Sequence, residues 1–365
     1  MNRSLSIVGA IALSTFAGRS AAAQSFNVDI DNVPPNAGNG VPVSGYEGAV
    51  AQAGTWNSIG PATATTSTLK NLDGTNASAT FTRATNGSFS GGNLMTSNFG
   101  LLYNDWQQIP AGAGNELVYS FNNLQAGNYL LYTYAHNTGT GGVGVKTDVE
   151  VVGAGGPDTI QCGGFLSANA FSQFNISHIV HSKTVTAGGS ITVKIRGTTG
   201  LGVVNGFQLV KLNGSFPVRK HVDDSAASSF YLGDTWTEPM SDLQDALAFA
   251  TMVGGANCEI WVAQGFYYPT GFQSSTDRTK SFVIPSGLRI YGGFAGTETS
   301  LSQRTSPAFF ITALSGAINS SAQTDNSYNV VVADGTSTST LVDGFSIVRG
   351  RASGRWRSRS EEHTS

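Results

Sequence analysis

Apolar and polar residues alternate along several short segments between residues 24 and 212. The clearest, Glu116–Leu124, leads through a Gln-Ala-Gly turn into Asn128–Asn137. Strict alternation buries one face of a strand and wets the other, the pattern of antiparallel sheets. We therefore predict that residues 24–212 form an antiparallel β-sandwich of jelly-roll type. The other predicted strands are Phe26–Ile30, Ala79–Arg83, Leu101–Ile109, Val143–Val152, Ser177–Thr186, Ser190–Thr198 and Asn205–Leu212.

The pattern changes after a short predicted linker, residues 213–220. Apolar runs of four or five residues, such as Glu259–Val262 and Leu288–Tyr291, are separated by turns rather than by helices. Such runs suit the coils of a parallel β-helix, in which each strand stacks on the equivalent strand of the next coil. The expected fold class is therefore all-β, with the sandwich followed by a β-helix over residues 221–350.

One segment of this second region, Ser241–Met252, has helical spacing. Ser241 is a suitable N-cap and Gln244 follows three residues later, as in a capping box. Asp242 and Asp245 lie in the first turn, where the helix dipole favours acids. We expect the helix to cover the first coil, because an open coil exposes unpaired edges and apolar side chains. Its apolar stripe comprises Leu243, Ala246, Leu247 and Ala250.

The first region resembles a known family. The segments Tyr46–Gly60, Leu124–Asn137 and Asn205–Leu212, the last with the motif NGFQL, are similar to galactose-binding-like jelly-roll modules of secreted bacterial proteins. Among these, the segments resemble those of planctomycete proteins in particular. The resemblance implies a β-sandwich and a secreted protein.

The second region resembles the start of right-handed β-helix surface proteins of the chlamydial polymorphic-outer-membrane-protein type. The motifs that carry the resemblance are IYGGFAGTE from Ile290, ALSGAI from Ala313, NSYNVV from Asn326 and VDGF from Val342. The resemblance implies a secreted or surface-exposed protein of adhesin type and implies no enzyme activity. It also predicts that the β-helix is right-handed and that the chain contains only its first coils.

Residues 1–23 are expected to be a secretion signal. Arg3 supplies the positive charge, Leu5–Ala17 the apolar core, and cleavage is expected between Ala23 and Gln24 after an A-x-A pattern. The apolar run is shorter than the roughly 20 residues that a membrane span needs. We therefore expect a secreted or cell-surface protein with no membrane span in this chain.

Residues 351–365 form a tail of different composition, with four arginines. Arg359–Ser365 resembles the translation of a common sequencing adapter. We predict that this segment is an artefact and that the native β-helix continues, so that the chain is a fragment truncated at its C-terminus.

Composition excludes some partners. Only 12% of residues are charged, the formal net charge is −3, and no basic patch points to nucleic acid. The two cysteines fall in different predicted regions, so we expect no disulfide, and we expect Cys258 to be a buried thiol rather than a ligand. No residue pattern predicts a cofactor or a metal site. His178 and His181, three apart on a predicted strand, point to opposite faces, which disfavours joint metal binding.

A carbohydrate site needs an exposed aromatic ring beside hydrogen-bonding side chains. Trp106 meets this requirement best, because Asn104 and Asp105 precede it in an expected loop. Tyr132 and Tyr134, which share one face of a strand, are further candidates. For all these aromatic residues, packing in the core is the alternative interpretation.

Three functions stay open. The first is a non-catalytic secreted or cell-surface adhesin or structural scaffold, and the second is a module that binds cell-surface or extracellular polysaccharide. The third is a polysaccharide-degrading enzyme, a lyase or glycoside hydrolase, whose catalytic coils are missing. Because the acidic residues after residue 221 do not recur at coil spacing, we expect no catalytic cluster in this chain.

Overall fold

A computed structural model describes most of the chain between residues 24 and 352. The described ranges are 24–31, 40–50, 52–61, 65–83, 87–91, 98–136, 146–153, 156–164, 177–212, 216–226, 233–270, 275–305, 309–319, 325–333 and 335–352. The predicted secretion signal and the tail from residue 353 lie outside these ranges. The protein is mostly β. Within the described ranges, no helix is long and apolar enough to cross a membrane.

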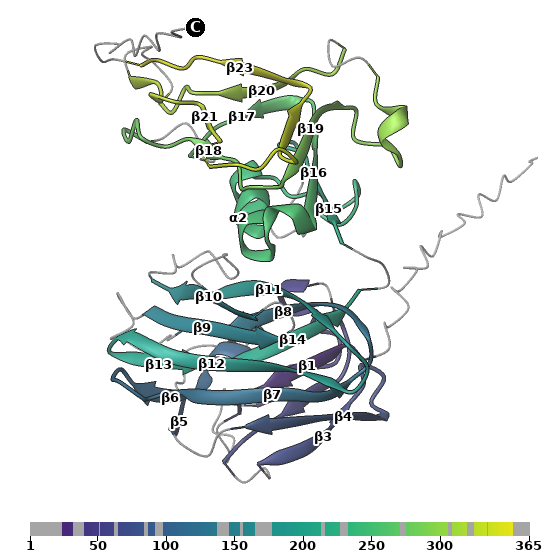
Figure 1. The fold of residues 1–365 in the computed structure, drawn as a ribbon, viewed down its shortest axis with the longest axis vertical. Coiled ribbons are helices and arrows are strands. Elements are labelled where there is room, and N and C mark those ends of the chain that lie inside the picture. Colours follow the sequence, from purple (N-terminus) through teal and green to yellow (C-terminus); the bar gives the residue numbers. More distant parts are fainter. Residues whose placement is uncertain are drawn as a thin grey trace, which may run out of the picture.

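Two antiparallel sheets pack face to face in the first region (Figure 1). One sheet has the order β11-β8-β14-β1-β2 and the other β10-β9-β12-β7-β4-β3, and a third, small sheet has the order β13-β6-β5. Among the described pairings of this first region, only β1 with β2 is parallel. The predicted antiparallel sandwich is thus observed. Its strands are β1 (Phe26–Asp29), β2 (Trp56–Ser58), β3 (Thr66–Lys70), β4 (Asn76–Arg83), β5 (Ser88–Gly91), β6 (Asp105–Pro110), β7 (Leu117–Leu124), β8 (Gly127–Tyr134), β9 (Lys146–Gly153), β10 (Gly156–Gly163), β11 (His178–Val185), β12 (Gly189–Thr199), β13 (Leu201–Val204) and β14 (Gly206–Lys211).

Aromatic side chains fill the space between the two large sheets. The rings of Phe81 and Phe121 meet edge to face at 4.9 Å between centroids, and the ring of Phe207 lies 5.2 Å from that of Tyr119. These residues come from alternate positions of β4, β7 and β14, as the sequence alternation predicts. Aromatic pairs in such geometries stabilise a core beyond the area they bury.

Two predicted boundaries are wrong. Leu101–Tyr103, predicted as strand, ends the helix α1 (Asn98–Tyr103), and the strand β6 begins only at Asp105. A short apolar run cannot by itself distinguish a buried helix from a strand. Residues 218–220, predicted as linker, belong to β15 (Val218–Val222), because Val218 pairs in parallel with Cys258.

From β15 onward every described strand pairing is parallel, and the chain visits three sheets in rotation. The sheets have the orders β15-β16-β19-β22, β17-β20-β23 and β18-β21. We call residues 218–348 the parallel-sheet region. Its strands are β15, β16 (Cys258–Ala263), β17 (Gly265–Tyr267), β18 (Phe282–Val283), β19 (Arg289–Phe294), β20 (Thr312–Ser315), β21 (Val331–Val332), β22 (Leu341–Asp343) and β23 (Phe345–Val348).

Glycines let successive passes of this region approach closely. A Cβ on Gly292 would lie 2.7 Å from the carbonyl oxygen of Gly344, and a Cβ on Gly344 would lie 2.5 Å from that of Gly292. Gly344 also has a φ of 81°, which favours glycine. The glycines of the IYGGF and VDGF motifs therefore meet each other, which is a packing reason for both.

The helix α2 (Leu243–Val253) confirms the predicted apolar stripe, whose four residues are all buried. The predicted N-cap is wrong. Asp242, in extended conformation, caps the helix by accepting a hydrogen bond from the Gln244 N–H at 2.8 Å. The Gln244 side chain does not reach back to the cap, because it donates to the carbonyls of Pro269 and Ser281. This links the helix to the parallel-sheet region.

The helix α2 lies between the sandwich and the parallel-sheet region (Figure 1). It packs against β15, β16 and β18, as expected for a helix that covers the first coil, and also against β11 of the sandwich. The Met252 sulfur accepts from the Val180 N–H at 3.4 Å, and the Ser182 hydroxyl donates to the Val253 carbonyl at 2.7 Å. One cluster of buried apolar side chains therefore runs through both regions.

Candidate functional site

The predicted sugar site at Trp106 is not exposed. Only 6% of Trp106 is accessible, and Asn104 and Asp105 are fully buried. The expected loop is instead the end of α1 followed directly by β6, which pairs on one side with β5 and on the other with β13. The Trp106 indole N–H donates to the Gln108 side chain at 2.8 Å. The prediction of an exposed Trp106 ring is therefore wrong, and the ring offers no open face to a sugar.

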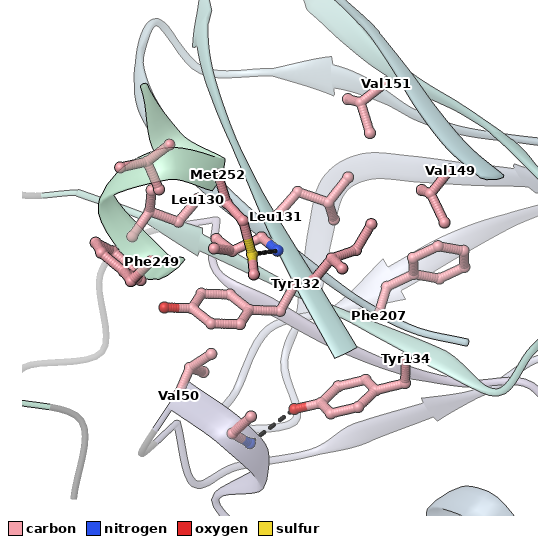
Figure 2. Packing of buried hydrophobic residues seen from close by; sticks show 14 of the residues in the cluster. Val50, Leu130, Leu131, Tyr132, Tyr134, Val149, Val151, Phe207, Phe249 and Met252 are labelled. Atoms are coloured by element: carbon pink, nitrogen blue, oxygen red, sulfur yellow. Dashed lines mark hydrogen bonds between the residues drawn. The ribbon is translucent and has the colours of Figure 1, made fainter. Parts of the chain in front are cut away.

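Tyr132 and Tyr134 are also buried, so the core interpretation is right for them. They lie on the face of β8 that points away from Phe207 and toward α2 and Val50 (Figure 2). The Tyr134 hydroxyl accepts from the Ala49 N–H at 2.7 Å and donates to the Gln208 side chain. The outer face of this sheet is thus covered by the chain itself.

Asn205 joins several of the predicted residues and was missed. Its side-chain N–H donates to the Asp105 carbonyl at 3.0 Å, its side-chain oxygen accepts from the His136 N–H at 2.8 Å, and its own N–H donates to the Tyr134 carbonyl. Asn205 stands in the NGFQL motif at the start of β14. The signal was available, since an Asn before a buried strand commonly satisfies backbone groups.

A buried acid lies at the end of β1. Neither carboxyl oxygen of Asp29 has a hydrogen-bond partner among the described residues. Burial, with contributions from nearby Asp105 and Asp31, raises the pKa of Asp29 well above its usual range. Within the described ranges no group of three or more His, Cys, Asp or Glu side chains is placed to hold a metal ion.

The remaining titratable candidates are interior groups. Burial lowers the pKa of both His178 and His181 to about 3, so both rings are neutral at pH 7. Cys162 and Cys258 are buried, reduced thiols whose pKa burial raises to about 12. Nucleophilic or acid–base chemistry needs such groups in an accessible cleft. These four side chains are instead part of the packing.

One group of accessible charged side chains lies in register on neighbouring strands of the parallel-sheet region. Parallel register places Arg219 of β15, Glu259 of β16 and Arg289 of β19 side by side. The Arg219 Nε donates to Glu259 Oε1 at 3.3 Å, and the Arg289 Nη1 lies 3.8 Å from Glu259 Oε2. The arginine side chains are 40% and 49% accessible, whereas that of Glu259 is 11% accessible. We call these three residues the arginine row.

Aromatic rings pack against the arginine row on the same face of the sheet. Trp261, Tyr291 and Phe294 form a small core of their own, with Trp236 packed against it. The Arg219 guanidinium lies 3.7 Å from the centre of the Trp261 ring, a cation–π contact. The Trp261 ring is itself stacked on Phe294 at 4.6 Å between centroids.

The sequence holds a signal for this arrangement. On each of three strands a charged residue stands two positions before a ring: Arg219 and His221, Glu259 and Trp261, Arg289 and Tyr291. Residues two apart on a strand share a face. The repeat is hidden because the strands lie far apart in the sequence.

Comparison with known proteins finds only weak structural likenesses. No protein-family model and no curated protein matches the chain. A GH115 4-O-methyl-α-glucuronidase with specificity for decorated arabinogalactans is 18% identical, with a TM-score of 0.24, over 35% of this chain and 16% of that enzyme. The module TmCBM61, in complex with β-1,4-galactotriose, is 18% identical, with a TM-score of 0.20, over 30% of this chain and 72% of the module.

A carbohydrate-binding module of the Cellvibrio mixtus lichenase 5A, in complex with cellotriose, is 16% identical, with a TM-score of 0.18. The match covers 41% of this chain and 89% of that module. At these TM-scores the likenesses carry no functional argument. The chain spans less than a fifth of the length of the glucuronidase, of which 16% is covered.

Proposed function

We propose that this chain belongs to a non-catalytic secreted or cell-surface scaffold that binds polysaccharide. In this proposal the sandwich is a jelly-roll module, and the parallel-sheet region is the first part of a right-handed parallel β-helix. The rotation of the chain through three parallel sheets supports the β-helix, because in that fold each coil adds one strand to each sheet. A role in adhesion is part of the same proposal.

The observation that carries the proposal is the shared core around α2. Its residues Phe249 and Met252 lie against the sandwich residues Leu130 and Tyr132 (Figure 2). Interfaces between domains that lack a common core are expected to move. A shared core with hydrogen bonds across it between side chains and backbone keeps the two regions in one orientation, so the protein can present surfaces of both at fixed positions. That is what a scaffold requires.

The positions of the ionisable groups also favour binding over catalysis. Asp29, His178 and His181, whose pKa values are strongly shifted, are in the interior of the sandwich, and Asp245, whose pKa is raised to about 6, lies in the first turn of α2. Some of the charges that solvent reaches form ion pairs across neighbouring strands, such as Arg196 with Glu116 and Glu150 at 2.8 Å. Extended rows of paired side chains suit a surface that binds a long polymer through many weak contacts.

The protein is expressed with its predicted secretion signal, and the test uses the secreted product, which is expected to begin at Gln24. A panel of neutral and anionic polysaccharides is first screened for binding and then incubated with the protein for release of new reducing or unsaturated ends. Binding without new ends supports the proposal. New ends would establish the polysaccharide-degrading alternative, and an absence of binding to every polysaccharide would refute the binding role.

A further inference from the structure

We propose that the arginine row, Arg219, Glu259 and Arg289, binds a carboxylated polysaccharide, one built from uronic acid units. The inference rests on the proposed polysaccharide role and specifies its ligand class and its site.

The first argument is the charge balance along the row. Two guanidinium groups share one carboxylate, so the row keeps one positive charge in excess. A second network on the sandwich has no excess, because Lys194 and Arg196 there match Glu116 and Glu150. In a chain whose net charge is −3, the arginine row is a place where an anion gains attraction.

Neighbouring charges leave this excess in place. Arg304 pairs with Asp343, and Lys220 pairs with Asp234 at 2.9 Å. The Glu298 carboxylate accepts from the N–H groups of three residues in its own turn. Arg289 begins β19, whereas Glu298 follows the end of that strand, so Glu298 lies beyond the opposite end of the strand from Arg289.

The second argument is that the guanidinium groups are held in position. Arg219 rests on the Trp261 ring, and Trp261 is fixed both by stacking on Phe294 and by its hydrogen bond to Glu259 at 2.8 Å. Arg289 donates to the Tyr291 hydroxyl at 2.5 Å. Side chains that are ordered before binding lose less entropy when the ligand arrives.

The third argument is that donors remain for a ligand. Arg219 uses its Nε for Glu259, and its two Nη groups have no protein acceptor among the described residues. A guanidinium fork matches the two oxygens of a carboxylate, and Glu259 already shows that a carboxylate fits between these arginines. A carboxylate is therefore an anion that suits this site.

The spacing suits a polymer. Arg219 and Arg289 are separated by one intervening strand, hence by about 10 Å across the sheet. An extended sugar chain that carries a carboxylate on each unit can contact both arginines at once. Leu341 of β22 lies beside Arg289 in the parallel register and is 40% accessible, so it provides an apolar contact for a sugar ring.

The experiment measures binding of polygalacturonate by affinity electrophoresis and by calorimetry, at low and at high salt. We expect binding that weakens with salt and falls about tenfold or more in Arg289→Gln, since a charge-assisted contact is lost. Arg196→Gln, which removes a similarly exposed strand arginine from the balanced network, is the matched control and should bind like the unchanged protein. Arg219→Gln should act like Arg289→Gln if its thermal midpoint is unchanged.

Arg289→Gln keeps the proposal testable even if Arg219→Gln unfolds, because the cation–π contact with Trp261 is made by Arg219 and that of Arg289 is with Tyr291. Equal losses in Arg289→Gln and Arg196→Gln, or no loss in either, would overturn the site. If the protein binds neutral polysaccharides but not polygalacturonate, the proposed ligand class is refuted, whereas the proposed polysaccharide-binding function is not. Double-stranded DNA is added as a competitor of polygalacturonate at the same concentration of negative charge. Complete competition would show that the site binds anions in general, which would also overturn the inference.

Discussion

Replacement of Asp245 by asparagine should stabilise the protein at neutral pH. Asp245 lies in the first turn of α2, where the helix dipole favours an anion. Burial nevertheless dominates, and together with nearby Asp242 it raises the pKa of Asp245 from its ordinary value of 3.8 to about 6. The folded protein therefore holds the proton more tightly than the unfolded chain does.

The sign and size of the effect follow from proton linkage. Below about pH 4 the carboxyl is protonated in both states, and Asp245 costs nothing. Between about pH 4 and pH 6 the unfolded chain ionises first, so stability falls as pH rises. Above pH 6 the full cost applies, and a shift of roughly two pKa units corresponds to at most about 3 kcal/mol.

The assay is urea unfolding of Asp245→Asn and of the unchanged protein at pH 7.5, 5 and 3.5, followed by tryptophan fluorescence. We expect the variant to be more stable at pH 7.5 by up to about 3 kcal/mol, less so at pH 5, and equal at pH 3.5. Asp277→Asn is the matched control, because hydrogen bonds from Thr279 lower the pKa of this exposed acid, and no gain at pH 7.5 is expected there. A difference that is the same at all three pH values, or a variant less stable at pH 7.5, would refute the reasoning.

Three further predictions concern the helix, the thiols and the N-terminus. Leu247→Ala, in the buried stripe of α2, should cost about 2–5 kcal/mol in urea unfolding, and an unchanged midpoint would contradict the packing. Cys162 and Cys258 should not react with a thiol reagent at pH 8 until the protein is unfolded, because burial raises the pKa of both thiols to about 12; rapid labelling of the native protein would show that one is accessible. Intact-mass measurement of secreted protein should give a chain that begins at Gln24, and a mass that includes Arg3 would exclude the predicted cleavage.

The alternation of side chains was sufficient to locate most of the sandwich strands. It is a local property, because neighbouring residues on a strand point to opposite faces wherever the strand lies. The stripe of α2 was predictable for the same reason. The cap was not, because Ser241 and Asp242 are both suitable residues and only the backbone conformation decided between them.

The candidate sites depended on tertiary structure. Whether Trp106 is exposed depends on β5, which precedes its strand, and on β13, which pairs with that strand from a distant part of the chain. Likewise Tyr132 is buried by α2, a helix that follows it by more than a hundred residues and that the sequence assigned only to the second region. A pattern in one segment carries no information about what covers it.

The arginine row also combines features that the sequence predicts with features that only the tertiary structure decides. The sequence by itself determined that Glu259 and Arg289 each stand two positions before a ring on a predicted strand, whereas Arg219 fell in the predicted linker. Only the parallel register of β15, β16 and β19 decided that the three lie side by side, with two cations and one anion in contact. The physical reason is that strand order and register are set by the packing of the whole stack, whereas periodicity is set within each strand.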